Sequence, residues 1–350
     1  MKKETFNMII RFLIGAAVSM LICAGMIVSG KWVSSKPLIQ QASGLKGTEI
    51  VMTVDGEEIS AEEYLYMANY SAQSLSYYGI TDLNTQLGEG YTAADYVAEQ
   101  AQSQAVQQAV VRKWAKEMNV TLTEDDQTAL TNRKESFGGE GGFEMLLRIN
   151  GIDEALYDQV SATSCLYENL YKTYCGEDGE MRPSDSDLTA LAEEHGLMTA
   201  NVLYVGTAQL DDAAKAEAKS LMEDYARQLK EANDKEAAFA ALETAENVAA
   251  YTGATYDACE ETVLNTALAA LEPGQVSDVV EDNAGYFVVL RCQTDLNAAA
   301  EMAFGEDLSA RMANAEVVYN EAVYHKIDLA AFYTKFSAAQ QRLYQQLMQA

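Results

Sequence analysis

The segment Leu264–Arg291 constrains the fold most, because it predicts a helix, two strands and the turns that join them in one short run. A helical stretch ends at Pro273-Gly274, a strand follows, and an Asn-Ala-Gly turn leads into a second strand, YFVVLR. A helix that leads into a hairpin buries its apolar face against the sheet that the hairpin joins. The segment therefore predicts the end of a small alpha/beta domain.

The residues before this segment predict the rest of that domain. They predict a strand at 201–206, helices at 211–232 and 236–242, and a further helix at 259–271. Apolar residues recur every three or four positions on one face of the longest helix, at Ala214, Ala218, Leu221, Tyr225 and Leu229. One strand, several helices and an antiparallel pair together predict a small alpha/beta sandwich.

The other regions are predicted to be mostly helical, so the expected fold class is α+β with a helical lobe. Asp55-Gly56 predicts a turn between two short extended segments, and Ser60 with Glu63 has the spacing of a capping box. Helices are expected at 62–78, 93–118, 143–149 and 153–174, and others begin at Thr123 and Ser184. After Asp295 the chain is expected to return to helices, at 303–324 and 329–348.

The amino terminus carries an apolar, uncharged run, Phe12–Gly30, behind a short basic stretch. Its length is close to the roughly 20 residues of a membrane-spanning helix. We therefore expect residues 1–30 to be an uncleaved signal anchor and residues 31–48 a polar tether. Cleavage after Gly30 is one alternative, and a lipid anchor at Cys23 is a less favoured one, because bulky residues precede that cysteine. All three place the bulk of the chain outside the cytoplasm, and the first makes it a single-pass protein of the cell membrane.

The composition argues against several classes of function. A formal net charge of −29 repels nucleic-acid phosphates, so we expect no nucleic-acid partner. The same charge opposes self-association, so a monomer or weak dimer is expected. The chain has only two histidines, His195 and His325, and no paired Cys-x-x-Cys or His-x-x-x-His motif. A zinc site is therefore not expected, and neither is another metal or a cofactor.

Several motifs carry a resemblance to known families. The 264–291 segment resembles the end of a parvulin-type peptidyl-prolyl isomerase domain, through Leu-x-x-Gly-x-Val-Ser at 271–277 and Gly285-Tyr286. The order of the motifs upstream resembles the SurA and PrsA families of exported foldases; these motifs are Val54–Ser60, Phe137-Gly-Gly, Gly151-Ile152 with Tyr157, and Ser184–Leu191 before Asn201-Val-Leu.

The resemblance implies a domain organisation. Residues 49–196 would form a helical chaperone domain like the amino-terminal domain of SurA, and residues 197–296 a degenerate parvulin-like domain. Residues 297–350 would supply carboxy-terminal helices that pack on the chaperone lobe. The parvulin-like domain would then be an insertion in that lobe.

The resemblance also implies where an isomerase site would lie. Parvulin domains use two facing histidines and a wall that grips the proline ring. Asn201 and Phe287 stand at the histidine positions, and Glu260 and Leu264 stand at the wall positions. The loop that carries an acidic or thiol residue in the family is shortened here to about 246–255. With both imidazoles replaced, the resemblance implies weak or no isomerase activity, and whether the chain is an enzyme stays open.

The cysteines permit one disulfide in this segment. Of the five cysteines, Cys23 lies in the predicted anchor, and an exported chain permits the others to pair. Cys259 and Cys292 both fall in the parvulin-like segment, so they are the candidate pair. The alternative is that these two, like Cys165 and Cys175, are buried free thiols.

Together these features predict a bacterial, membrane-tethered, extracytoplasmic chaperone that binds unfolded or partly folded exported proteins. An active parvulin-type isomerase is one alternative, and an envelope scaffold that docks one specific protein is another. The candidate client-binding side chains share one predicted helix: Tyr64, Tyr66, Met67, Tyr70 and Tyr77. Amphipathic rings and pliable thioethers accept varied sequences. The alternative is that these side chains belong to the core.

Overall fold

The computed structural model describes residues 37–245, 248–257 and 260–348, and it divides into two compact units. The helical unit runs to Lys172 and resumes at Asp307, and the sheet unit is Thr173–Glu306. Each unit is described by itself below. The predicted α+β class with a largely helical content is confirmed. Within the described ranges, no helix combines the length and the apolar character that a bilayer span requires; the predicted anchor lies outside those ranges.

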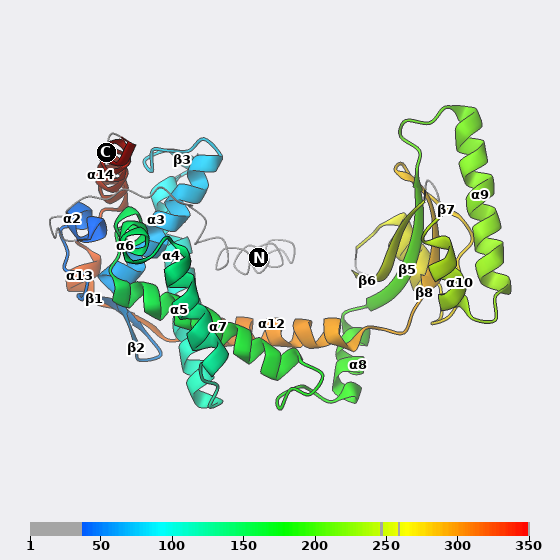
Figure 1. The fold of residues 1–350 in the computed structure, drawn as a ribbon, viewed down its shortest axis with the longest axis horizontal. Coiled ribbons are helices and arrows are strands. Elements are labelled where there is room, and N and C mark those ends of the chain that lie inside the picture. The colour runs from blue at the N-terminus through cyan, green and yellow to red at the C-terminus, as the bar shows by residue number, and fades with distance from the viewer. Residues whose placement is uncertain (1–36, 246–247, 258–259, 349–350) are drawn as a thin grey trace. The chain divides into compact units, whose positions relative to one another are not determined.

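The helical unit is built on long helices and a small sheet (Figure 1). Its elements are α2 (Leu38–Ser43), β1 (Ile50–Val54), β2 (Glu57–Ser60), α3 (Ala61–Tyr77), β3 (Gln86–Gly88), β4 (Tyr91–Thr92), α4 (Ala93–Glu117), α5 (Glu124–Ser136), α6 (Glu140–Asn150), α7 (Glu154–Cys175), the end of α12 (Leu296–Asn314), β9 (Val317–Tyr319), α13 (Glu321–Tyr324) and α14 (Leu329–Met348). α3 packs along α4, and α14 packs against α2, α3 and α4.

The carboxy-terminal strand β9 corrects one sequence prediction. Residues 303–324 were expected to form one helix, but α12 ends at Asn314 and Val317–Tyr319 pairs antiparallel with β1 in a sheet of order β2-β1-β9. β-branched and aromatic residues favour a strand, and the edge of β1 offers them unpaired backbone groups. The carboxy-terminal segment is therefore held to the amino-terminal hairpin by backbone hydrogen bonds.

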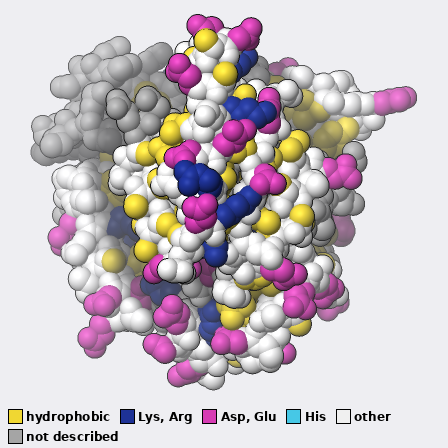
Figure 2. All heavy atoms as spheres, turned by 90° about the vertical axis from the view of Figure 1, so that its right-hand side faces the viewer, with side chains coloured by type: hydrophobic (Ala, Val, Ile, Leu, Met, Phe, Trp, Pro, Cys, Tyr) yellow, Lys and Arg dark blue, Asp and Glu magenta, His cyan; other side chains and the backbone are white. Residues whose placement is uncertain are grey.

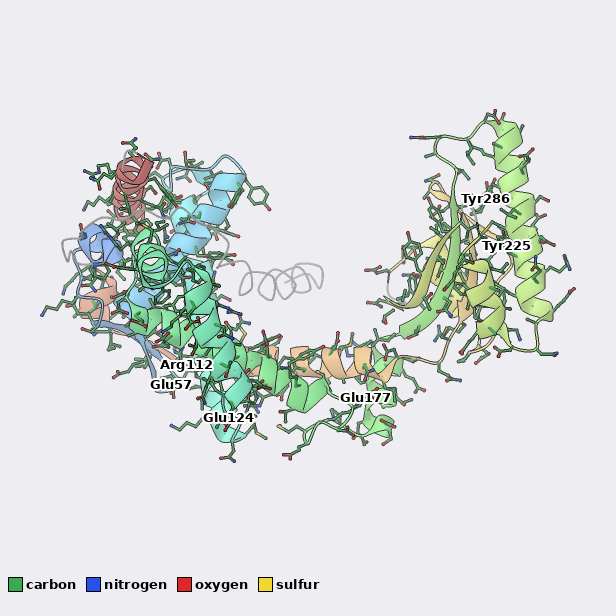
Figure 3. The ribbon with its side chains drawn as sticks, viewed as in Figure 1. Glu57, Arg112, Glu124, Glu177, Tyr225 and Tyr286 are labelled. Carbon is green, nitrogen blue, oxygen red and sulfur yellow. The ribbon has the colours of Figure 1, made fainter. Side chains whose placement is uncertain are left out.

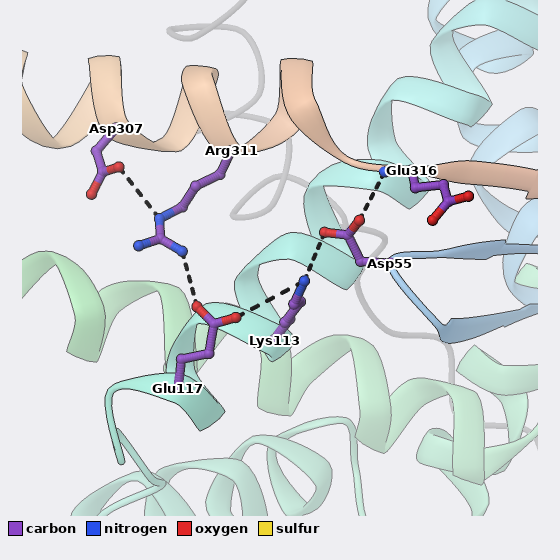
Figure 4. A network of polar contacts seen from close by, with 6 residues as sticks. All are labelled: Asp55, Lys113, Glu117, Asp307, Arg311 and Glu316. Atoms are coloured by element: carbon purple, nitrogen blue, oxygen red, sulfur yellow. Dashed lines mark hydrogen bonds and ion pairs between the residues drawn. The ribbon is translucent and has the colours of Figure 1, made fainter.

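Asp55 adds a side-chain link between the same segments (Figure 4). It occupies the left-handed region, with φ 51°, in the turn between β1 and β2. Its carboxylate accepts a hydrogen bond from the Glu316 backbone N–H at 2.8 Å and pairs with Lys113 at 3.0 Å. The Glu316 N–H and then Lys113 lower the pKa of Asp55. Lys113 and Arg311 both contact Glu117, so the network ties α4 to the end of α12.

Two adjacent carboxylates at the start of α3 lie in the core. The Ser60 Oγ caps the helix by accepting from the Glu63 N–H at 3.1 Å, as predicted. The Glu63 carboxylate does not complete the capping box, because it pairs with Arg112 at 3.0 Å (labelled in Figure 3) and accepts from Gln159 Nε2. Burial raises the pKa of Glu63, and Arg112 partly offsets this rise. By contrast, the box at Thr123 and Asp126 is complete.

Glu62 provides a prediction about pH. Its carboxylate accepts from the Asp153 N–H at 2.7 Å and from Gln40 Nε2 at 3.0 Å, while burial raises its pKa above the ordinary 4.5. A folded-state pKa above the unfolded value adds stability at low pH that is lost as pH rises through the folded pKa. Relative to Glu62→Gln, the native chain should therefore lose stability between pH 4.5 and neutrality.

Urea unfolding between about pH 4 and about pH 8, followed by Trp114 fluorescence, measures this difference. The exposed neighbour Glu58→Gln is the matched control and should follow the native curve. If the free energy of unfolding of Glu62→Gln changed with pH in parallel with that of the native chain, the prediction would be contradicted.

The sheet unit is a four-stranded antiparallel sheet with helices on both faces. Its elements are α8 (Asp185–Glu194), β5 (Leu197–Gly206), α9 (Asp212–Glu231), α10 (Lys235–Leu242), β6 (Ala249–Asp257), α11 (Val263–Ala269), β7 (Val280–Glu281) and β8 (Gly285–Arg291). The strand order is β6-β5-β8-β7. Figure 3 labels Tyr225 of α9 and Tyr286 of β8, which pack in the core beneath α9.

The outer face of α9 is solvated. Figure 2, which looks onto this side, shows Lys and Arg side chains near the middle with Asp and Glu side chains around them. Lys219 pairs with Glu281 at 3.1 Å, and Lys230 pairs with Asp278. These two basic groups are therefore neutralised locally.

β6 corrects a second prediction. Residues 246–255 were expected to be a shortened loop, but Ala249–Asp257 forms an edge strand along β5. The pairing contains a bulge, because Ala200 pairs with Ala254 while Val202 pairs with Tyr251. The helix expected at 259–271 is also shorter, since Thr262 caps α11 by accepting from the Asn265 N–H at 3.0 Å.

Candidate functional site

The candidate site lies on the face of the sheet that α11 covers. Side chains alternate between the two faces of a strand, and the residues on this face form one apolar cluster: Met198, Ala200, Val202, Leu268 and Val289. Tyr256, Leu264, Leu271 and Phe287 are partly buried and pack against it. The opposite face carries Leu203, Val205, Val288 and Leu290 toward α9.

Phe287 is fixed by its neighbour across the strands. It pairs in register with Tyr204, and the two rings stack with centroids 4.8 Å apart. The Tyr204 hydroxyl donates to the Ala284 carbonyl at 2.9 Å, which holds that ring against the β7–β8 turn. Phe287 therefore presents a partly exposed aromatic surface on an ordered strand.

Asn201 does not face Phe287, which corrects the facing arrangement that the resemblance implies. Asn201 pairs with Leu290, which belongs to the cluster beneath α9, whereas Phe287 packs on the α11 face. The Asn201 Oδ1 accepts from the Gly253 N–H at 2.7 Å, inside the β6 bulge, where Gly253 has φ 63°. Asn201 is 8% exposed, so the geometry gives it a structural contact with the bulge.

The two predicted wall positions differ in their surroundings. Leu264 lies on α11 and packs against the same cluster as Phe287, so the structure brings these two together. Glu260 precedes α11 and is exposed. Its backbone carbonyl accepts from Asn265 Nδ2 at 3.2 Å, which helps to form the turn before the helix.

Three tyrosines of the site were not predicted from the sequence. Tyr204 lies beside Phe287, and Tyr251 pairs with Val202, which places it on the same face with 52% of its surface exposed. Burial and then the proximity of Tyr251 raise the pKa of Tyr256. Tyr251 and Tyr256 share a face only because the bulge shifts the alternation between them. Sequence periodicity therefore carried no signal for this pair.

The site contains no imidazole. His195 follows α8 and lies 3.0 Å from Glu306. His325 follows α13 and lies 2.7 Å from Glu321, so neither histidine belongs to β5 or β8. The polar atoms that the aromatic side chains bring to the face are tyrosine hydroxyls. The described residues hold no cluster of His, Cys, Asp and Glu suited to a metal ion. The arrangement suits contact with apolar and ring-shaped side chains.

Only one cysteine of the candidate disulfide lies in the part of the chain that the structure describes. Cys292 is a free thiol in the structure, and Cys259 lies outside the described residues. Burial raises the pKa of Cys292, which disfavours its thiolate. Cys292 donates its backbone N–H to the carbonyl of Thr199, two residues before Asn201, at 2.9 Å.

The client-binding candidates on α3 separate into two groups. Tyr64, Tyr66 and Met67 are core residues, exposed by 1%, 8% and 2% respectively, so they line no surface. Tyr70 is partly buried, and Tyr77 is 90% exposed. The physical reason is that α3 packs against α4, α2, α14 and the small sheet, which bury most of its circumference.

The sheet unit contains the segment of the chain that matches a known protein family. Residues 192–302 match the family described as the PPIC-type PPIASE domain, a segment that contains β5 to β8 with α9, α10 and α11. No curated protein matches the sequence.

Several solved structures are similar over most of their length. Foldase protein PrsA from Lactococcus lactis is 17% identical, with 82% of this chain and 99% of that chain covered and a TM-score of 0.29. The peptidylprolyl isomerase PrsA from Bacillus anthracis is 17% identical, with 68% and 96% covered and a TM-score of 0.26. A structure of SurA-like chaperones from Campylobacter jejuni is 11% identical, with 77% and 98% covered and a TM-score of 0.21. Residues 192–302 are therefore similar to the PPIC-type PPIASE domain family, and the chain as a whole is similar to solved foldases and SurA-like chaperones.

Proposed function

We infer that the chain is an extracytoplasmic chaperone whose PPIC-type domain binds segments of unfolded exported proteins and catalyses prolyl isomerisation weakly or not at all. The observation that supports this function best is the composition of the α11 face. Phe287, Tyr204, Tyr251 and Leu264 form an apolar, partly exposed surface without an imidazole. The proposed membrane tether is supported by the apolar run Phe12–Gly30.

The chemistry of the face favours binding over catalysis. Rotation about a prolyl bond crosses a barrier of about 18–20 kcal/mol, and lowering it requires polar groups aimed at the twisted imide. Phe287 can neither donate nor accept a hydrogen bond, and Asn201 lies on the other face. Aromatic and aliphatic side chains still gain free energy by burying a client's apolar side chains or a proline ring.

A client aggregation assay tests the binding function. The full chain should suppress aggregation of a chemically unfolded client, and Tyr251→Ser should weaken suppression because it removes an exposed ring from the face. Val318→Ser is the matched control, since Val318 is exposed to nearly the same extent, 53% against 52%, and lies on β9. Absence of suppression by the native chain would contradict the function. Suppression of one client alone among several unrelated ones would favour the scaffold alternative.

Restoring the two histidines should not restore activity. In Asn201→His with Phe287→His, the imidazoles would point from opposite faces of the sheet, so they cannot act on one imide. We expect the double variant to stay within about twofold of Phe287→His alone in a protease-coupled assay on an Ala-Pro peptide, a span below the range of general acid–base effects. A much larger gain in the double variant would show that the two positions cooperate.

A further inference from the structure

One end of the helical unit carries a cluster of exposed aromatic residues. It runs from the end of α3 through the β3–β4 hairpin into α4 (Figure 1). Tyr77, Tyr78 and Leu87 are exposed by 90%, 76% and 40%. We call Tyr77, Tyr78, Leu87, Tyr91 and Tyr96 the tyrosine tip. Exposed aromatic surface of this kind marks an interaction site more often than scattered apolar residues do.

The tip is ordered. Leu83 is 2% exposed and anchors the loop, and its carbonyl accepts from the Ala94 N–H at 2.8 Å. Thr92 and Asp95 form a complete capping box at the start of α4. The Tyr91 hydroxyl donates to Glu99 at 2.7 Å. A partner that docks here would meet rings already held in place, which lowers the entropic cost of binding.

The cluster joins both helices. Burial and then the proximity of Tyr78 raise the pKa of Tyr96, so the end of α3 lies close to the first turns of α4. Burial and then the proximity of Tyr77 likewise raise the pKa of Tyr70. The packing of α3 along α4 therefore places Tyr78 and Tyr96 near each other.

The surroundings of the tip are uniformly acidic. Asp82, Glu89, Asp95 and Glu99 are exposed beside it. Hydrogen bonds from Asn84 lower the pKa of Asp82, and hydrogen bonds from Thr92 lower the pKa of Asp95, so both stay charged at neutral pH. The sequence contains no Lys, Arg or His between Lys46 and Arg112. Arg112 is 16 residues beyond Tyr96 on α4, about 24 Å along the helix.

We propose that the tyrosine tip docks extended, Lys- or Arg-bearing segments of unfolded client proteins. A cation over the face of a tyrosine is attracted by the ring, and the surrounding carboxylates neutralise its charge. A second copy of this chain is disfavoured as the occupant, because the net charge of −29 makes two copies repel. The inference rests on the proposed chaperone function and specifies the chemistry of its clients.

The test uses the full chain in mild detergent and three fluorescent peptides of identical length. The first carries Lys and Arg among apolar residues, the second has Gln at the cationic positions, and the third has Glu there. Fluorescence anisotropy measures binding to the native chain and to Tyr77→Ser with Tyr78→Ser. Both side chains are largely exposed, so the fold should persist. Glu89→Lys tests the charge, and Glu177→Lys, an exposed position of the sheet unit, is its control.

The expected result is binding in the order cationic, neutral, acidic. The double tyrosine variant should weaken cationic-peptide binding about tenfold, as two lost cation–π contacts would. Glu89→Lys should weaken it and Glu177→Lys should not, and raising salt from about 50 to about 300 mM should reduce the preference for cations. Equal binding of the three peptides, or unchanged binding by the double variant, would overturn the inference.

Failure of this inference can be distinguished from failure of the proposed chaperone function. If the native chain suppresses client aggregation but binds all three peptides equally, the chaperone function is supported and the proposed role of the tyrosine tip is contradicted. A native chain that binds the cationic peptide at the tip but suppresses no aggregation supports the tip and contradicts the chaperone function.

Discussion

Replacing Arg112 with Ala should destabilise the helical unit by about 3–5 kcal/mol, because it leaves a buried carboxylate without its partner. Glu63 is exposed over only 2% of its side chain and lies 3.0 Å from Arg112. Gln159 Nε2 would remain as its hydrogen-bond donor, and an amide does not neutralise the charge. Urea unfolding followed by Trp114 fluorescence measures the loss, since Trp114 lies on the same helix.

A second substitution identifies the cause of that loss. Glu63→Gln in the Arg112→Ala background removes the unpaired charge, so the double variant should recover part of the stability. Lys116→Ala, at an exposed position of α4, is the control and should stay near the native value. A loss below about 1 kcal/mol for Arg112→Ala would place this pair among ordinary surface salt bridges and contradict the description of the core.

Gly285→Ala should destabilise the sheet unit by about 1–3 kcal/mol through overpacking. A Cβ at this position would lie 2.0 Å from the Val205 carbonyl oxygen and 2.8 Å from Tyr204 Cε2. The strands would have to separate at the site where Tyr204 and Phe287 stack. Neither tryptophan of the chain, Trp32 or Trp114, lies in this unit, so hydrogen exchange of the β5 and β8 amides is the suitable measurement.

Gly206→Ala is the matched control, because Gly206 pairs directly with Gly285. A Cβ there would first meet the Tyr204 hydroxyl at 3.0 Å, the far end of a side chain that can shift. Its effect on exchange should be the smaller of the two. Equal protection in both variants would show that β5 and β8 do not approach as closely as described.

Most helices and the closing hairpin were predictable from local signals. The helix α2 was not, because residues 31–48 were expected to be a polar tether, whereas Leu38–Ser43 is a helix that packs against α14 with Ile39 and Ala42 buried. Ser60, Thr123 and Ser184 each cap a helix as predicted, and β7 and β8 follow the Pro273-Gly274 turn. The short strands β3 and β4 were not predicted, and neither were β6 and β9, which were missed for different reasons. β9 is a three-residue strand whose partner, β1, lies far away in the sequence, so local pattern carried no information on the pairing. β6 contains a bulge, which breaks the alternation that identifies strands.

The candidate site was predictable only in part. The resemblance to parvulin domains identified Phe287 and Leu264, which share one apolar cluster. It placed Asn201 opposite Phe287, and the strand register shows why this fails: Phe287 pairs with Tyr204, three residues from Asn201, which puts the two side chains on opposite faces. Among the α3 candidates, spacing could not distinguish residues that face α4 from residues that face solvent. The exposed end at Tyr77 became visible only in the structure.

We propose that the PPIC-type domain binds client segments with little or no catalysis of their isomerisation. Exchange NMR on an Ala-Pro peptide, recorded with and without the full chain, tests both parts in one experiment. We expect broadened peptide resonances, which report binding, while cis and trans forms exchange close to the uncatalysed rate, in tens to hundreds of seconds. Cis–trans exchange that becomes orders of magnitude faster with a substoichiometric amount of the chain would contradict the proposed function and make the chain a working isomerase.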